Sequence, residues 1–246
     1  MCITLVYVEQ NPNAKYKLIL LNNRDELLTR PTSIARWEND ILAGRDERES
    51  ARGTWLCMST TGHISNLLTI TVPMHKMKSN SATRGRANEY DQYELAGLTY
   101  QPDDEIEITK YPSGIHGFSN SPPREPFKKV QRGIEKMSTI IEEINSKNYS
   151  EAQIIEHLLQ LATDKHQCFP DDQLKRRCGR STEICKYRTA IFVKFPDGIP
   201  YGTRSHTIII VDRNNRVTYY EKSMEAGERR ASEDTWTERI FHFQLI

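Results

Sequence analysis

The sequence predicts an α+β protein, because strand-like segments occupy both ends of the chain and helix-like segments occupy its middle. Apolar, β-branched runs stand near the N-terminus and again between residues 190 and 221, whereas residues 127–162 carry apolar side chains at helical spacing. The 246 residues contain neither an internal repeat nor a clear linker. We therefore expect a single domain over residues 1–246, which at this length should bury roughly 70–75% of its unfolded surface.

The first two strands should form an antiparallel hairpin. Residues 2–8 and 17–22 are apolar and β-branched, and the polar stretch 9–14 between them has the composition of a turn. A hairpin of this shape returns the end of its second strand to the start of its first. The quartet Asn23-Arg24-Asp25-Glu26 would therefore lie beside Cys2, within reach of its side chain.

The remaining elements follow from local patterns of hydrophobicity, turn residues and helix capping. The pattern Ser150-Glu151-Ala152-Gln153 is a capping box, and the helix that it opens should run to Ala162. The elements predicted in order are a hairpin (54–59 and 64–70), a polar loop (73–89), an amphipathic helix (127–146), the capped helix (150–162), a basic irregular segment (168–186) and strands at 190–195, 207–211 and 216–221.

Composition argues against several classes of protein. Lys and Arg total 34 and Asp and Glu total 33, so the formal net charge of +1 gives no reason to expect nucleic acid as a partner. No apolar stretch approaches the roughly 20 residues that span a bilayer, and no signal-peptide pattern opens the chain. The five cysteines lack a disulfide framework, which indicates reduced thiols in a cytoplasmic or organellar-matrix setting.

Cys2 is the first residue that could carry chemistry. It is small, so removal of Met1 would leave it with both a thiol and a free α-amine, whose unperturbed pKa of about 7.7–8.0 suits a base near pH 7. We predict that the mature protein lacks Met1. Asp25 could then fix the amine, and Arg24 could favour the thiolate. The alternative is that Cys2 is a small buried residue of a terminal strand, and the residues by themselves favour that alternative.

Three further side chains could bind an anion. Asn120 ends a strand-like stretch in an Asn-Ser-Pro turn, and its amide could donate to an oxyanion, although an ordinary turn explains the same residues. Arg204 follows Gly202 just before a late strand and offers a planar fork for a carboxylate or phosphate. Arg188 is the second candidate for that role. We predict no metal site, because His166, Cys168, Cys178 and Cys185 lack the paired short arms of structural zinc sites.

Several blocks, in order along the chain, resemble the transport and Golgi organisation protein 2 family, which is also named for its NRDE motif. The motif itself is Asn23-Arg24-Asp25-Glu26. The other blocks are Leu20-Leu21-Asn22, Arg30-Pro31, Gly53-Thr54-Trp55-Leu56, Gly117-Phe118-Ser119-Asn120, Tyr201-Gly202-Thr203-Arg204, residues 207–212, Glu221-Lys222-Ser223-Met224 and a terminal strand from Trp236 to Phe243.

The resemblance implies a fold similar to the N-terminal-nucleophile hydrolases, with two antiparallel sheets flanked by helices in αββα layers. It also implies intracellular haem movement, from sites of synthesis or storage to cytosolic and other haem-using proteins. Haem would be a transported ligand rather than a catalytic cofactor, and the partners would be haem donors and acceptors. The implied location is cytoplasmic, with the mitochondrion and the Golgi as further sites. A peripheral contact with an organelle membrane is the sharper explanation of the basic residues at 175–180, and a solvated loop is the simpler one.

On this interpretation one cleft near Cys2 should gather the ligand-binding residues. Haem needs an apolar slot, a cation for its propionates and in some proteins an axial side chain. His116 and His206 adjoin family blocks and are the axial candidates, although a hydrogen-bonded or surface role explains either one. The predicted ligand-binding residues are Asn23, Arg24, Asp25, Glu26, Arg204 and Arg188.

The alternative function is an N-terminal cysteine amidohydrolase or acyltransferase that acts on an amide or thioester, such as an acyl-CoA. Its catalytic residues would be Cys2, Asp25 and Asn120. Related hydrolases carry an oxyanion-binding Asn after the strand that corresponds to residues 64–67, where this chain has Leu68-Thr69-Ile70. That departure favours the binding protein over the enzyme.

Overall fold

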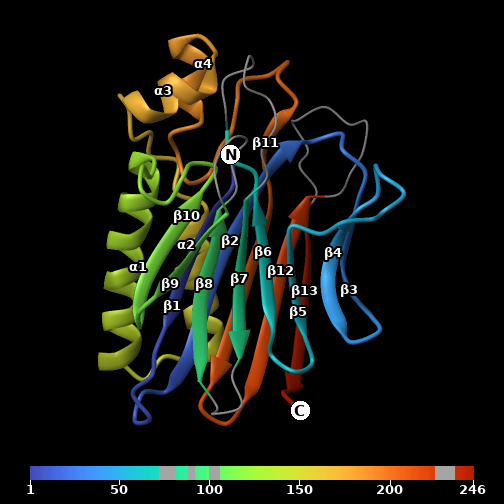
Figure 1. Ribbon diagram of the computed structural model, residues 1–246, viewed down its shortest axis with the longest axis vertical. Coiled ribbons are helices and arrows are strands. Elements are labelled where there is room, and N and C mark those ends of the chain that lie inside the picture. Colours follow the sequence, from blue (N-terminus) through green and yellow to red (C-terminus); the bar gives the residue numbers. More distant parts are fainter. Residues whose placement is uncertain (72–80, 88–91, 100–105, 225–235) are drawn as a thin grey trace.

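The computed structural model describes residues 1–71, 81–87, 92–99, 106–224 and 236–246 (Figure 1). One set of strands is β1 (Ile3–Val8), β2 (Tyr16–Leu27), β10 (Gly114–Ser119), β11 (Tyr201–Asp212), β12 (Arg216–Met224) and β13 (Trp236–Gln244). The other set is β3 (Thr32–Glu38), β4 (Ile41–Asp46), β5 (Leu56–Ser59), β6 (Ile64–Leu68), β7 (Ser81–Ala87), β8 (Tyr93–Thr99) and β9 (Glu107–Tyr111). The helices are α1 (Lys128–Ser146), α2 (Glu151–Ala162), α3 (Asp172–Cys178) and α4 (Thr182–Tyr187).

The strands form two antiparallel sheets. The first sheet has the order β10-β1-β2-β11-β12-β13, and the second runs β3-β4-β5-β6-β7-β8-β9. In the first sheet β2 and β11 are each twelve residues long and are hydrogen-bonded to each other at its centre. The α+β class is therefore confirmed, with strands from both ends of the chain in one sheet.

Two hydrophobic cores lie on opposite faces of the first sheet. Alternate side chains of β1 belong to different cores: Ile3 and Leu5 pack toward the helices, whereas Val6 and Val8 pack toward the second sheet. Figure 1 shows α1 and α2 along one face of the first sheet, with the second sheet on the other. The described residues thus form three layers, helix on sheet on sheet, and the expected fourth layer of helices is not found among them.

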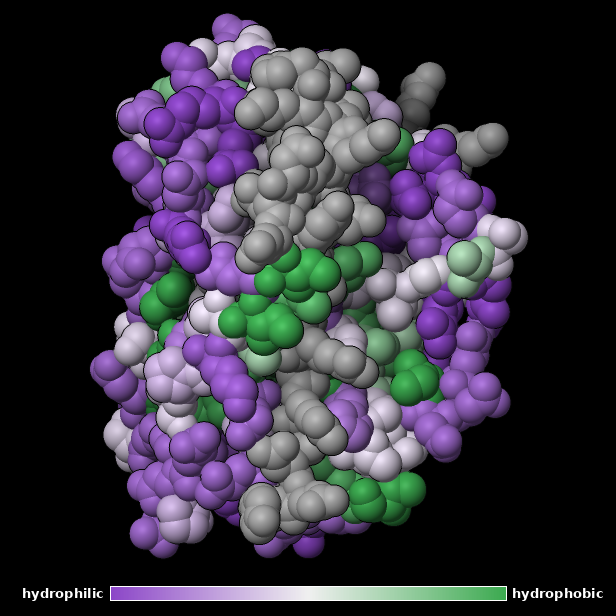
Figure 2. Space-filling model, viewed as in Figure 1, coloured by the Kyte–Doolittle hydropathy of each residue, from purple (hydrophilic) through white to green (hydrophobic). Residues whose placement is uncertain are grey.

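The outer face of the second sheet carries exposed hydrophobic side chains. Leu67, Leu98 and Ile108 are exposed, and the strand register places Leu98 directly opposite Ile108. Figure 2 shows hydrophobic residues gathered near the middle of this face. In the described part of the chain no helix covers them, and no helix there is long and apolar enough to cross a membrane.

The N-terminal hairpin forms as predicted, but its second strand extends beyond the apolar residues 17–22 that predicted it. Ile3 stands opposite Asn23, and β2 continues through the whole quartet to Leu27. The predicted helices and the capping box are also confirmed: the Ser150 hydroxyl accepts from the Gln153 backbone amide while the Gln153 side chain accepts from the Ser150 amide. The strands predicted at 207–211, at 216–221 and at the C-terminus form as well.

Several local predictions are wrong. Residues 81–87 of the predicted loop 73–89 form β7, and residues 72–80 and 88–91 lie outside the described chain. The segment 190–195 is not a strand: it makes one isolated bridge, between Lys194 and Gly202. Its apolar residues Ala190, Ile191, Val193 and Phe195 are buried in irregular structure. The segment 168–186 contains two short helices, α3 and α4, capped by the Asp171 and Ser181 side chains.

Candidate functional site

The register of the first sheet sets Cys2 between two of the predicted site residues. Ile3 stands opposite Asn23 on one side and Ser119 on the other, so Cys2 lies between Arg24 and Asn120. Ile3 packs against the helices, and Cys2, one residue earlier, packs on the opposite face against the core between the sheets. The period of two along each strand therefore turns these three side chains toward the space between the sheets.

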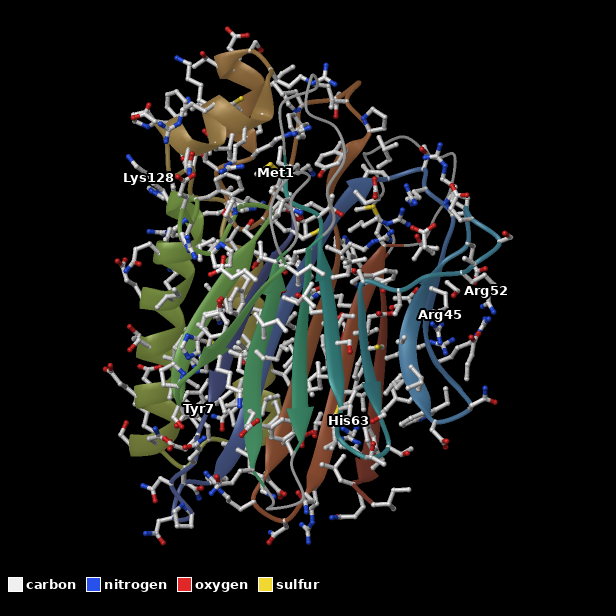
Figure 3. The ribbon with its side chains drawn as sticks, viewed as in Figure 1. Met1, Tyr7, Arg45, Arg52, His63 and Lys128 are labelled. Carbon is white, nitrogen blue, oxygen red and sulfur yellow. The ribbon has the colours of Figure 1, made fainter. Side chains whose placement is uncertain are left out.

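A cavity of about 610 Å³ opens at this end of the molecule. Figure 3 shows Met1 in the upper part of the molecule, whereas Tyr7 and His63 lie in the lower half. Most of the predicted site residues line this cavity. The predicted site residues that do not line it are Asn23, Arg204, His116 and His206. The lining comprises Met1, Cys2, Arg24, Asp25, Glu26, Arg30, Asp46, Glu49, Ala51, Gly53, Thr54, Trp55, Leu67, Thr69, Ile70, Thr71, Asn120, Arg188 and Tyr201.

Asp25 holds a buried cluster of charges behind the cavity. Its carboxylate lies 2.8 Å from the α-ammonium of Met1 and 3.8 Å from Nζ of Lys129, and the Thr203 hydroxyl donates to it over 2.5 Å. Burial lowers the pKa of the Met1 amine and of the Lys129 amine, and the charge of Asp25 opposes both shifts. One carboxylate therefore serves two buried cations.

Tyr201 and Lys129 fix the position of Met1. The Met1 amine donates to the Tyr201 hydroxyl over 2.8 Å, and Nζ of Lys129 donates to the Met1 carbonyl over 2.5 Å. Sequence reasoning missed both residues, because Lys129 reads as one basic residue at the start of an amphipathic helix. The removal of Met1 stays a prediction.

The Cys2 thiol lies close to the backbone of Asp25. Its Sγ accepts from the Asp25 amide over 3.4 Å and is 3.7 Å from the Asp25 carbonyl. Burial raises the pKa of the Cys2 thiol, and the nearby α-ammonium opposes that shift. With Met1 attached, the thiol has no amine of its own residue to act as a base.

Two arginines form one wall of the cavity through a shared carboxylate. Arg24 donates to Asp46 over 3.1 Å and to the Thr32 hydroxyl over 2.9 Å, and its guanidinium lies 4.0 Å from the centre of the Trp55 ring. Arg30 donates to the same Asp46 oxygen over 2.6 Å. Asp46, at the end of β4, and Arg30, in the turn after β2, were not predicted as site residues.

Arg204 and Arg188 occupy different positions relative to the cavity. Arg204 is buried, and one guanidinium nitrogen donates to the carbonyls of Leu27 and Arg30. It therefore holds the turn that follows β2, and burial lowers its pKa to about 10. Arg188 lines the cavity, with its guanidinium 5.1 Å from the centre of the Tyr201 ring. Among the described residues no carboxylate lies within ion-pair distance of Arg188.

The predicted axial histidines lie elsewhere. His116 is on β10 and pairs with the Pro112 carbonyl over 2.8 Å. His206 is buried on the helical side, where Nδ1 pairs with the Asn23 side chain over 2.7 Å and the ring stacks on Trp236 at 5.2 Å. Asn23 in turn donates to two carbonyls beneath the helices, so both its interactions face away from the cavity.

Asn120 presents an acceptor rather than a donor. Its Nδ2 donates to the Thr69 carbonyl over 2.6 Å, which fixes the amide orientation. Its Oδ1 is buried without a hydrogen-bond partner in the described part of the chain, and the residue is 7% exposed. An oxyanion needs donors, so Asn120 in this orientation does not supply one.

No set of three or more His, Cys, Asp and Glu side chains in the described chain is arranged to hold a metal ion. No disulfide joins the described cysteines.

Comparisons with known proteins give one consistent result. The model of a family described as Transport and Golgi organisation 2 matches residues 1–93 and 86–226. The chain is 27% identical over 288 residues to the Transport and Golgi organization protein 2 homolog of Homo sapiens, covering 100% of this chain and 99% of that protein. It is 27% identical over 271 residues to Transport and Golgi organization protein 2 of Drosophila melanogaster, covering 91% and 92%. The mouse homolog is 28% identical over 285 residues, covering 100% and 99%.

Proposed function

The chain belongs to the transport and Golgi organisation 2 family, and from that premise we propose that it binds haem in the cavity beside Cys2 and carries it between proteins inside the cell. Its partners on this proposal are haem donors and haem acceptors. The proposed location is cytoplasmic, with mitochondrial and Golgi sites as the further possibilities that the family resemblance implies.

The observation that carries the proposal is the mixed character of the cavity. Trp55 and Ile70 give it apolar surface, while arginines stand along its lining. A volume of about 610 Å³ lies within the usual range of small-molecule sites. Haem combines a flat apolar body with two carboxylates, so a slot with cations at its polar side suits it.

Arg188 is the best candidate for a propionate. Arg24 and Arg30 are both paired with Asp46, whereas the Arg188 guanidinium contacts the Tyr201 ring and the Cys178 sulfur and has no carboxylate partner among the described residues. An arginine without a carboxylate partner keeps its full capacity for a charge-assisted bond. The earlier preference for Arg204 is weaker, because its guanidinium is engaged with two backbone carbonyls.

Titration of the purified full-length chain with ferric haem tests the proposal. We expect saturable binding at one haem per chain, and transfer of that haem to apomyoglobin as an acceptor. Arg188→Met should weaken binding about ten- to a hundredfold, since a hydrogen bond to a charged group contributes roughly 1.5–3 kcal/mol. Arg216→Met, an exposed substitution at the start of β12, is the matched control. Absence of saturable binding, or equal affinity in both variants, would contradict the proposal.

A second function is supported by one observation: Cys2, Asp25 and Asn120 line the same cavity. These are the catalytic residues expected for an N-terminal cysteine hydrolase. Two stacked antiparallel sheets, and a carboxylate that already holds an α-ammonium, also support the proposed kinship with the N-terminal-nucleophile hydrolases. The engaged amide of Asn120 favours the binding function over this one.

The enzyme and the carrier are distinguished by the N-terminus. Intact mass identifies whether Met1 is retained. If it is removed, hydrolysis of an acyl thioester or an N-acyl amide by the wild type, but not by Cys2→Ser, would support the hydrolase. A processed protein that is inactive on both probes would leave haem binding as the proposed function.

A further inference from the structure

We propose that the Cys2 sulfur is the axial ligand of the haem iron in this cavity, an inference that rests on the proposed haem binding. The ligand would be a thiolate, one of the known axial groups of haem proteins. In the binding step the sulfur–iron bond forms, the thiol proton passes to solvent and the iron stays ferric.

The lining of the cavity narrows the choice of ligand. Among the described residues that line it, none is a histidine, and both predicted axial histidines face other surroundings. Three groups of the lining remain, the thioether of Met1, the thiol of Cys2 and the hydroxyl of Tyr201. The Tyr201 hydroxyl already accepts from the Met1 amine over 2.8 Å and donates to the Asp25 carbonyl over 3.3 Å, which leaves the two sulfur atoms. Sulfur is a ligand that haem iron accepts, so the question is which of the two can reach it.

Cys2 is better placed than Met1. Met1 is 4% exposed, belongs to the core between helices and sheet, and its sulfur accepts from the Thr71 hydroxyl over 3.7 Å. Cys2 is only partly buried and packs on the side between the sheets, where the cavity opens. A ligand between the sheets therefore meets the Cys2 sulfur without displacing the hydrophobic core.

The backbone beside Cys2 already provides a hydrogen bond that would orient a sulfur ligand. The Asp25 amide donates to Sγ over 3.4 Å, and hydrogen bonds to a ligating sulfur both orient it and tune the metal. Arg24, the neighbour of Cys2 across β2, places a cation on the same side of the sheet, where it offsets the charge of a thiolate.

Asn120 points independently to an occupant of this cavity. It is more than nine-tenths buried, directly follows β10 beside Cys2, and its Oδ1 has no partner in the described chain. A buried acceptor without a partner costs roughly 1–3 kcal/mol, so a donor from an occupant would relieve it. A water at the haem edge supplies such a donor.

Ferric haem added to the full-length wild type, to Cys2→Ser and to the control Cys57→Ser tests the assignment. Cys57 is on β5 and does not line the cavity. Absorption and electron paramagnetic resonance spectra should show thiolate ligation in the wild type and in Cys57→Ser, and lose it in Cys2→Ser. Affinity in Cys2→Ser should fall at least about tenfold, since even the loss of an outer-sphere partner of a metal ligand has that effect.

A second measurement uses the unmodified chain, so it does not depend on how Cys2→Ser folds. Haem should slow alkylation of Cys2 by iodoacetamide and leave the rate at Cys57 unchanged, as mapped by mass spectrometry. If haem binds but the wild-type and Cys2→Ser spectra coincide and Cys2 is not protected, the ligand assignment is overturned and haem binding stands. If the wild type binds no haem saturably, the proposed function itself fails.

Discussion

Asp25 is the carboxylate that balances the buried positive charges behind the cavity. It lies between the α-ammonium of Met1 and Lys129, and all three side groups are almost wholly buried. Two cations and one carboxylate in a low-dielectric region are tolerated only while the carboxylate is charged and in place. Its surroundings also include the Thr203 hydroxyl, so β11 shares in holding it.

Asp25→Asn should therefore lower the free energy of unfolding by about 3–5 kcal/mol, because it leaves two buried cations without a counter-ion. Urea denaturation at neutral pH measures the loss. Asp40→Asn, at an exposed position, is the control and should change stability by less than about 0.5 kcal/mol. A loss below about 1 kcal/mol in Asp25→Asn would show that the cluster is better solvated than its burial indicates.

His206 gives a pH dependence with a defined sign. Burial lowers its pKa from 6.5 to about 4, with Lys222 acting in the same direction and Asp25 against it. Between those values the unfolded chain binds a proton that the folded chain refuses, so stability decreases as the pH falls through this window. The loss is complete near pH 4 and reaches about 3 kcal/mol, and nothing is lost above pH 6.5.

His206→Gln should remove that part of the pH dependence, although it also lowers stability at neutral pH by disturbing the contact with Asn23. Stability of both proteins measured by denaturation between pH 4 and pH 7 checks this. His63→Gln, at an exposed position, should keep the wild-type slope. An unchanged slope in His206→Gln would assign the acid sensitivity to other groups.

At the scale of elements, helix α1 approaches the first sheet closely because a glycine on each element, Gly117 on β10 and Gly133 on α1, leaves room for the side chains opposite. A Cβ on Gly117 would lie 2.7 Å from Cγ1 of Val130, and one on Gly133 would lie 2.9 Å from Cδ2 of Leu5. Val130 is β-branched and stiff, whereas Leu5 is met at the flexible end of its side chain.

Gly117→Ala should therefore destabilise the protein by about 1–3 kcal/mol through overpacking. Gly133→Ala should cost less, because alanine gains about 1 kcal/mol over glycine in a helix. Chemical denaturation of the two variants gives their order, with Gly53→Ala as a control in which the added Cβ meets nothing within 4 Å. The reverse order would mean that Leu5, not Val130, is the rigid side of this contact.

At the scale of the whole molecule, the first sheet separates two cores that are packed independently. Leu42 is wholly buried between the sheets, and Leu158 is wholly buried beneath the helices. The cavity opens at one end of the space between the sheets, so its walls come from both sheets while its charged support, Lys129, comes from the helical layer.

Leu42→Ala and Leu158→Ala should each cost about 2–5 kcal/mol, the usual effect of removing a buried leucine side chain. Because the side chains share no partners, the double variant should lose the sum to within about 0.5 kcal/mol. A double-mutant cycle in urea measures the coupling. A coupling above about 1 kcal/mol would show that the first sheet transmits packing changes from one core to the other.

The local sequence was sufficient to predict the elements that depend on residues close together in the chain. The N-terminal hairpin follows from two apolar runs and a polar turn, and α2 begins at Ser150 because its capping box is complete within four residues. The proximity of Cys2 to the quartet also follows, since the register of a hairpin is fixed by its turn.

Only the tertiary structure decided which charged groups face the cavity. The sequence favoured Arg204 over Arg188 as the anion ligand, yet Arg204 binds backbone carbonyls and Arg188 lines the cavity. Strand β7, with little apolar alternation, forms because β6 and β8 supply its hydrogen bonds. Lys129 meets Met1 across 128 positions of sequence, and His206 is turned to the helical side by its register with Asn23. Such contacts depend on how distant segments pack, and no local pattern of residues encodes that.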